Sequence, residues 1–300
     1  MGVIPINNVL SEQPVIGITM GDAAGIGPEI IVKALADPII RRAARYIVFG
    51  MHEQLVYAAD HAEIECFWGR VQHEKIAREY PYKAVVADYD EYSVPPWICG
   101  PSKVAGESSV RLCKDAIDAA KFGIVDAVVT GPINKTSWNL AKEKWPGHTE
   151  LFADQCKSPR KAMMFVSGPL KLALATIHEA LFELRHRFTI GCVFEPIDLL
   201  NTALHTYFGL ERPKIGVAGL NPHAGENGQF GDEEQRVISP AILLAQEQGI
   251  NCHGPYSADT LFLRAIKGEF DAVVAMYHDQ GMITVKLLDP ENAVNVTIGI

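Results

Sequence analysis

The sequence predicts an α/β protein with a mainly parallel sheet, and two observations support this fold class. Short apolar runs alternate with helical segments along all 300 residues, as in folds built from strand–helix units. The apolar runs are continuous rather than alternating with polar residues, which is expected when helices cover both faces of a sheet. Because no repeat or low-complexity linker divides residues 1–300, we expect one unit made of two interwoven α/β halves. Ligands should bind outside the carboxyl ends of the strands.

The elements follow in order as apolar runs and helical patterns. Strands are predicted at Val15–Thr19, Arg45–Phe49, Lys83–Ala87, Asp126–Thr130, Ala162–Val166, Leu172–His178, Lys214–His223, Asp271–His278, Ile283–Leu287 and Ala293–Ile298. Helices are predicted at Ile30–Leu35, His52–Asp60, Ser102–Phe122, Glu150–Gln155, Glu179–His186, Pro196–Phe208 and Glu233–Gln248, with another that ends at Lys267. Glycine, proline or a polar side chain follows most of the strands, which marks their carboxyl ends as sites for ligands.

Composition limits the functional classes. The formal net charge of −9 argues against a general affinity for nucleic acid or anionic membranes, although a local basic pocket could still bind an anionic substrate. No apolar run approaches the roughly 20 residues that a transmembrane helix needs. Residues 1–14 lack a secretory-signal pattern, and we expect them to form a short disordered or strand-leading tail. With six scattered cysteines, we expect a cytoplasmic protein with reduced thiols.

The first strand runs into a glycine-rich segment, Met20–Glu29, that leads into a helix. Pro28 suits the first helical turn, and Glu29 suits the positive end of the helix dipole. The segment resembles a phosphate cradle, but its glycine spacing is not that of the dinucleotide fingerprint. A tight turn between strand and helix is the structural alternative.

Three predicted strands end at a histidine: His178, His223 and His278. A histidine at a strand end is often a structural residue, but three at one edge of a parallel sheet indicate a metal site. Three neutral imidazoles and an open position are typical of catalytic zinc, and other divalent ions fit as well. Asp259 and Asp279 are candidates to orient the ligands or the substrate. Either could instead be a turn residue, and Asp259 could be a helix N-cap.

The candidates for binding an anionic substrate are Lys135, His148, Thr149 and Lys286. A lysine within the apolar run Ile283–Leu287 indicates a side chain that faces a cleft. His148 and Thr149 open a helix, where backbone N–H groups favour a phosphate or a carboxylate. Thr149 could also be a plain helix cap.

Six ordered motifs connect the chain to a known family. They are Thr19–Glu29, Gly131–Lys135, Gly147–Glu150, Leu220–Glu226, Gly254–Thr260 and Tyr277–Gly281. With these motifs the chain resembles the 4-hydroxythreonine-4-phosphate dehydrogenases and their close relatives over nearly its whole length. The resemblance implies a fold like that of isocitrate and isopropylmalate dehydrogenases, with the active site in the cleft between the halves. It also implies a homodimer whose active site is completed across the subunit interface.

The resemblance further implies three groups of site residues. The family's metal ligands match His178, His223 and His278, one of them contributed by the partner subunit. Substrate contacts match His148, Thr149, Lys286 and Asn295. Carboxylates near the metal match Asp259 and Asp279, and with Lys286 these are the expected catalytic residues.

The chain departs from the family pattern in three places. Ala23 replaces a proline in the first glycine loop, and Glu179-Ala180 follow the first metal histidine where an apolar residue and proline are common. The second difference lies in a segment that varies among relatives with other substrates. The family continues beyond Ile300 with a segment that carries a substrate arginine and a nucleotide-side Asp-His-Gly, which we expect to be absent here.

These observations favour an NAD- or NADP-linked dehydrogenase with one divalent metal: zinc, magnesium, manganese or cobalt. It would oxidise and decarboxylate a small phosphorylated hydroxy acid, 4-hydroxythreonine 4-phosphate in pyridoxal phosphate biosynthesis. Alternatives within the family are 4-phospho-threonate, 4-phospho-erythronate or a cis-dihydrodiol carboxylate. Two other classes are a zinc hydrolase, which three histidines alone would permit, and a two-lobed binding protein.

Overall fold

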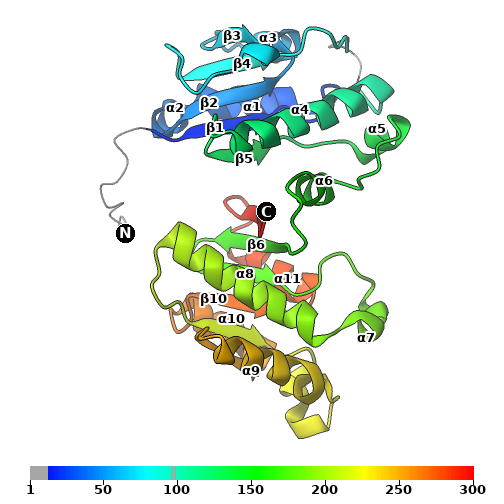
Figure 1. The fold of residues 1–300 in the computed structure, drawn as a ribbon, viewed down its shortest axis with the longest axis vertical. Helices are drawn as coiled ribbons and strands as arrows, with labels where there is room; N and C mark the ends of the chain where they lie inside the picture. The colour runs from blue at the N-terminus through cyan, green and yellow to red at the C-terminus, as the bar shows by residue number, and fades with distance from the viewer. Residues whose placement is uncertain (1–12, 96, 98) are drawn as a thin grey trace. The chain divides into compact units, whose positions relative to one another are not determined.

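Continuous apolar runs become the central strands of two sheets (Figure 1). The computed structural model describes residues 13–95, 97 and 99–300, so residues 1–12 of the expected tail lie outside the described part. The chain divides into two units, Met1–Cys156 and Lys157–Ile300. Each unit is a sheet covered by helices, which confirms the predicted α/β class with mainly parallel strands. Interweaving of the halves and the relation to isocitrate dehydrogenase stay predictions.

The first unit contains a parallel five-stranded sheet. Its strands are β1 (Val15–Thr19), β2 (Arg45–Gly50), β3 (Gly69–Gln72), β4 (Ala84–Asp88) and β5 (Ala127–Thr130), in the order β3-β4-β2-β1-β5. Strand β4 is buried throughout, as its apolar run predicted. Strand β3 was not predicted, because only Gly69 of its four residues is buried and the segment carries no apolar run.

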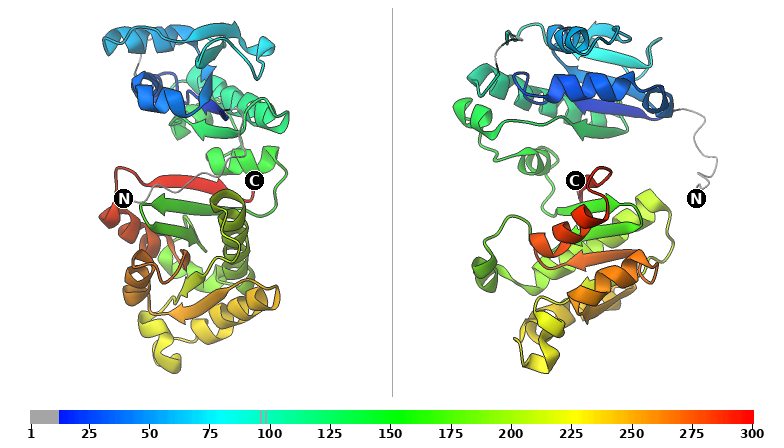
Figure 2. Two further views of the ribbon diagram at one scale, coloured as in Figure 1. Left: turned by 90° about the vertical axis from the view of Figure 1, so that its left-hand side faces the viewer. Right: turned by 180° about the vertical axis from the view of Figure 1, so that it is seen from behind.

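Helices cover both faces of this sheet. They are α1 (Gly27–Ala36), α2 (Pro38–Ala43), α3 (His52–His61), α4 (Lys103–Lys121), α5 (Lys135–Leu140) and α6 (His148–Gln155), with a 3₁₀ turn at His73–Lys75. Helix α4 lies on one face, and α1 and α3 lie together on the other (Figures 1 and 2). The Ser102 side chain caps α4 by accepting a hydrogen bond from Ala105 N–H, a typical start signal.

The second unit contains a mixed six-stranded sheet. Its strands are β6 (Ala162–Ser167), β7 (Leu170–Leu174), β8 (Ile215–Ala218), β9 (Cys252–Tyr256), β10 (Ala272–Ala275) and β11 (Val294–Ile298), in the order β11-β6-β7-β10-β8-β9. Strands β7, β10, β8 and β9 run parallel, whereas β6 and β11 pair antiparallel at one side. Four neighbouring strands therefore end at the same edge.

The helical segments of the second unit again form two layers. They are the 3₁₀ turn η2 (Leu181–Glu183), α7 (Leu184–Arg187), α8 (Ile190–Phe208), η3 (Pro222–Gly228), the π-helical η4 (Glu234–Ile238), α9 (Ser239–Glu247), α10 (Ala258–Ile266) and α11 (His278–Leu288). Successive strand residues face opposite layers: Leu172 packs in the cluster with α10 and α11, and Ala173 in the cluster with α8 and α9. No helix in the described part of the chain has the length and apolarity needed to cross a membrane.

Two predicted elements of this unit were wrong. The segment Ile283–Leu287 is part of helix α11 and not a strand. Gly281 and Val285 are buried while Ile283, which would share their face in a strand, is exposed, so the burial follows the helical period. Helix α8 begins at Ile190, not at Pro196, because the Thr189 side chain caps it by accepting from Cys192 N–H.

We predict that Gly281→Ala destabilises the second unit. A Cβ atom at Gly281 would lie 2.6 Å from a Leu172 methyl carbon and 2.9 Å from one of Leu174. Overpacking of this kind costs about 1–3 kcal/mol, measurable as a lower urea midpoint. The matched control is Ile283→Ala on the exposed side of α11, expected within about 0.5 kcal/mol of the wild type. Equal midpoints for the two variants would contradict close packing of α11 on the sheet.

Candidate active site

The carboxyl edge of the second sheet gathers four of the predicted site residues. His178 follows β7, His278 follows β10, His223 follows β8 and Asp259 follows β9. Because these strands are parallel neighbours, their exit loops share one edge. The structure therefore brings residues from distant parts of the sequence to one edge of the sheet.

His178 and His278 form a close pair. Their ring centroids are 5.6 Å apart with an interplanar angle of 41°. Zinc–imidazole bonds of about 2.0–2.1 Å place the centroids of two rings on one tetrahedral ion roughly 5 Å apart. His278 Nδ1 lies 2.8 Å from Asp279 Oδ1, a contact that fixes the ring orientation and leaves Nε2 for a ligand. The pair thus has the spacing and the carboxylate support of metal-binding histidines.

His223 does not join this pair within one chain. Among the described residues, no three His, Cys, Asp or Glu side chains lie close enough together to hold a metal ion. The His223 ring instead lies 6.1 Å from the ring of Phe230. The backbone from His223 to Asn227 is left-handed, with φ between 41° and 79°. Such a conformation costs on the order of 1–3 kcal/mol for each non-glycine residue and often marks a functional loop.

A buried carboxylate holds the base of the His223 loop. Glu234 is 3% exposed, and its Oε1 accepts hydrogen bonds from Leu220 N–H and Asn221 N–H at 2.8 and 2.7 Å. Asn221 Nδ2 donates to Glu234 Oε2 at 2.9 Å. Sequence reasoning gave Glu234 no role, because its partners lie 13 and 14 residues earlier and no local pattern connects them.

Side-chain hydrogen bonds fasten the strand exits to one another. Gln280 accepts from Met276 N–H at 2.6 Å and donates to the Gly219 carbonyl at 2.8 Å, which joins the exits of β10 and β8. Thr176 Oγ1 donates to the Met276 carbonyl at 2.7 Å and joins the exit of β7. Gln280 belongs to the Tyr277–Gly281 motif, so the motif was a signal for this role although none was assigned from sequence.

Three other predicted residues of this unit are on helices α10 and α11 and on strand β11. Lys286 is exposed in the last turn of α11, eight residues after His278, a rise of about 12 Å along the helix. Among the described residues its side chain makes no hydrogen bond or ion pair. Asp259 is in the first turn of α10, not at its N-cap Ser257, whose hydroxyl donates to it at 2.7 Å. Asn295 is exposed on strand β11.

A pocket of about 360 Å³ is lined by residues that are close in sequence to the three histidines. Its lining includes Phe182, Arg185, Asn221, Arg236 and Tyr277. Arg185 makes no ion pair with any residue in the described part of the chain, so its positive charge faces the pocket without a carboxylate partner. Arg236 is paired with Asp232 and Glu233, and Glu233 also lines the pocket. The pocket therefore combines aromatic walls with one unpaired guanidinium, that of Arg185, which suits a small anionic ligand.

In the first unit, His148 is a half-buried, neutral imidazole whose Nε2 atom is buried. Its ring packs edge-on against Trp138 and Phe152, with centroids 5.9 and 6.5 Å away. Burial lowers the pKa of His148 to about 4, and its Nε2 has no hydrogen-bond partner among the described residues. An unpartnered buried nitrogen is costly in a folded protein and is often a ligand-binding group. Thr149, the next residue of α6, is half-buried.

The glycine loop after β1 has a structural explanation. The Asp22 carboxylate accepts hydrogen bonds from Ala24 N–H at 2.8 Å and from the Ser137 hydroxyl at 2.7 Å. A Cβ atom at Gly27 would lie 2.0 Å from the Met20 carbonyl oxygen, so only glycine allows this approach. These contacts favour the tight-turn alternative over a phosphate cradle.

Comparisons with known proteins agree on one family. A family model described as pyridoxal phosphate biosynthetic protein PdxA matches residues 42–300. The 4-hydroxythreonine-4-phosphate dehydrogenase of Desulforapulum autotrophicum is 39% identical over 298 residues, 96% of this chain and 85% of the relative. The D-threonate 4-phosphate dehydrogenase of Cupriavidus necator is also 39% identical, over 291 residues, 96% of this chain and 86% of the relative.

A solved structure supports the same conclusion. The crystal structure of 4-hydroxythreonine-4-phosphate dehydrogenase from Klebsiella pneumoniae superposes with a TM-score of 0.87 at 35% identity. The match covers 96% of this chain and 88% of that one.

We predict that Glu234→Gln loosens the loop that carries His223. The amide would put an N–H group where Asn221 now donates, and an unmade hydrogen bond of this kind costs about 1–3 kcal/mol. Hydrogen exchange of the amides in residues 219–228, measured by mass spectrometry, should accelerate.

The matched control is Glu233→Gln. Glu233 also accepts from Asn221 Nδ2, at 2.7 Å, but in the described part of the chain it bonds no backbone N–H. In the Glu233→Gln variant, hydrogen exchange of the amides in residues 219–228 should stay close to that of the wild type. Equal acceleration in both variants would show that Glu234 has no special role.

We also predict a pH-dependent contribution of His148 to stability. Its pKa is near 6.5 when unfolded and about 4 when folded, so the unfolded state binds the proton first as the pH falls. Stability from this group is therefore present above pH 6.5 and lost progressively towards pH 4. At pH 5 the loss is about 1–2 kcal/mol. Between pH 7 and 5, urea unfolding of His148→Gln should lose less stability than the wild type, and parallel losses would contradict the shifted pKa.

Proposed function

Because the chain belongs to the family of the pyridoxal phosphate biosynthetic protein PdxA, we propose that it is a dehydrogenase acting on a small phosphorylated hydroxy acid. The substrate is 4-hydroxythreonine 4-phosphate, as the name of the relative from Desulforapulum autotrophicum suggests. The second candidate is D-threonate 4-phosphate, favoured by an equally similar relative with that name. Because these relatives are named dehydrogenases, the zinc hydrolase and binding-protein alternatives are not retained.

The observation that carries the proposal is the His178–His278 pair at the carboxyl edge of the second sheet. Its 5.6 Å spacing and its two imidazole donors fit a divalent ion, and imidazole donors favour zinc or cobalt over magnesium. When bound, such an ion acts as a Lewis acid that polarises the substrate hydroxyl. Asp279 holds the His278 ring in a fixed orientation through Nδ1.

We assign the third ligand position to His223 of a second copy of this chain. Within the described residues of one chain the histidine pair has no third ligand, which supports a homodimer with shared active sites. The strained His223 loop, supported by Glu234, presents an exposed imidazole suited to such a contact. Each His178–His278 pair would then be completed by His223 of the other copy.

Oxidation of the secondary alcohol removes a hydride and a proton, and NAD or NADP, when bound, would supply the nicotinamide that accepts the hydride. The β-keto acid that results then loses carbon dioxide. Lys286, exposed and without an ion pair in the described part of the chain, is our candidate for neutralising the developing negative charge or relaying a proton. Neutral His148, with Thr149 beside it, binds the substrate, and so does Asn295. Asp259 is proposed to orient groups around the metal.

The substrate is tested by nicotinamide reduction. The chelated protein is mixed with each candidate acid, with NAD or NADP and with zinc, magnesium, manganese or cobalt. We expect absorbance at the NADH band to grow with 4-hydroxythreonine 4-phosphate or D-threonate 4-phosphate after metal is restored. No growth with any combination would contradict the proposal.

We predict that His223→Ala lowers activity by more than roughly 100-fold, because even residues that only support metal ligands contribute 10–100-fold. Metal content after dialysis should fall in parallel. The control is His205→Ala, an exposed histidine of α8 with no expected role. Full activity of His223→Ala in metal-depleted buffer would overturn the scheme.

A further inference from the structure

A second polar pocket lies at the amino edge of the sheet in the first unit. It has a volume of about 390 Å³ and is lined by the starts of three strands, at Val15, Arg45 and Lys83. Strand β1, which begins at Val15, is five residues long, so its two ends are about 15 Å apart. Ligands of parallel sheets normally bind at the carboxyl ends. This pocket is therefore separate from the glycine loop that follows β1.

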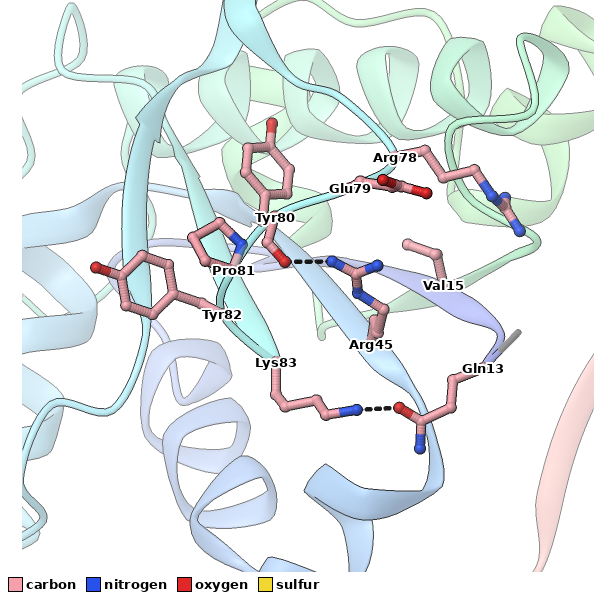
Figure 3. Close-up of a pocket in the computed structure, with 9 residues that line it drawn as sticks. All are labelled: Gln13, Val15, Arg45, Arg78, Glu79, Tyr80, Pro81, Tyr82 and Lys83. Atoms are coloured by element: carbon pink, nitrogen blue, oxygen red, sulfur yellow. Dashed lines mark hydrogen bonds between the residues drawn. The ribbon is translucent and has the colours of Figure 1, made fainter. Parts of the chain in front are cut away.

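Two cations of this pocket, Arg45 and Lys83, come from neighbouring strand starts and have no carboxylate within ion-pair distance among the described residues. Tyr46 N–H donates to the Lys83 carbonyl at 2.8 Å, which makes the starts of β2 and β4 neighbours. The Arg45 guanidinium donates to the Tyr80 carbonyl and the Lys83 ammonium donates to the Gln13 side-chain oxygen, as the dashed lines of Figure 3 show. Neither has an acidic partner among the described residues, so two positive charges are left uncompensated.

Two other charged residues, Arg78 and Glu79, also line the pocket. Arg78 directs its guanidinium to Asp126, with two hydrogen bonds of 3.0 Å, so its charge is already balanced. Glu79 also lines the pocket and makes no hydrogen bond or ion pair with any described residue. The pocket thus offers two cations for an anionic group and one carboxylate for a group that donates hydrogen bonds.

We propose that this pocket binds a small phosphate monoester, with the phosphate at Arg45 and Lys83 and an ammonium or hydroxyl group at Glu79. A phosphate monoester carries nearly two negative charges at neutral pH, which matches the two unpaired cations. The planar guanidinium retains donors besides the one used by Tyr80, and it suits phosphate oxygens. The ammonium of Lys83 adds a second positive charge to the lining of the same pocket.

The test is protection of Lys83 from acetylation, followed by peptide mass spectrometry on the full chain. Inorganic phosphate at millimolar concentration and constant ionic strength should slow labelling of Lys83 several-fold. Lys75 is the internal control, because it also donates to a glutamine side-chain oxygen but lies outside the pocket. Phosphoethanolamine, which adds an ammonium group, should protect at lower concentration than phosphate.

Variants locate the site. Arg45→Gln should abolish the protection, whereas Arg42→Gln should not, since Arg42 also donates to a backbone carbonyl but lies outside the pocket. Glu79→Gln should remove the advantage of phosphoethanolamine. Nicotinamide-reduction activity without added phosphate should be unchanged in Arg45→Gln, which shows that the variant is folded.

Three results would overturn the proposal. The first is no protection of Lys83, or equal protection of Lys75. The second is unchanged protection in Arg45→Gln. The third is equal protection by succinate, which would assign the pocket to carboxylates and not to phosphate.

Discussion

The amide of Gln280 links two strand exits on which the candidate active site depends. It accepts a hydrogen bond from Met276 N–H, at the exit of β10, and donates to the Gly219 carbonyl, at the exit of β8. An amide side chain is suited to this position because it carries a donor and an acceptor at one end. With Thr176 bonded to the Met276 carbonyl, the three strands that lead to the histidines are fixed at their exits.

This framework explains why the histidines differ in their surroundings. His178 and His278 follow strands β7 and β10, which are direct neighbours, so their rings meet at 5.6 Å. The chain reaches His223 only after four further residues beyond β8 and turns there into a left-handed run. Glu234 supports the base of that run. The loop therefore holds its imidazole away from the pair of its own chain, which is consistent with the proposed site shared between two copies.

Much of the architecture could be predicted because short stretches of the sequence indicate the strands and their ends. Continuous apolar runs such as Asp271–His278 predicted buried parallel strands, and polar residues after them marked the edge where ligands bind. The prediction was wrong for Ile283–Leu287, since an apolar run of five residues has no clear period and only contact with the sheet selects the helix. It missed β3, whose stability comes from pairing with β4 and not from its own apolar residues.

The sequence by itself predicted the residues that we propose carry the chemistry, and it predicted that strands bring the three histidines to one edge, because strand pattern and family motifs are both read along the chain. Only the tertiary structure decided that His178 and His278 meet while His223 stays apart. It also decided that Arg45 and Lys83, which are 38 residues apart in the sequence, line the same pocket. Strand order and loop conformation arise from packing and hydrogen bonds between distant segments, and local propensity does not encode them.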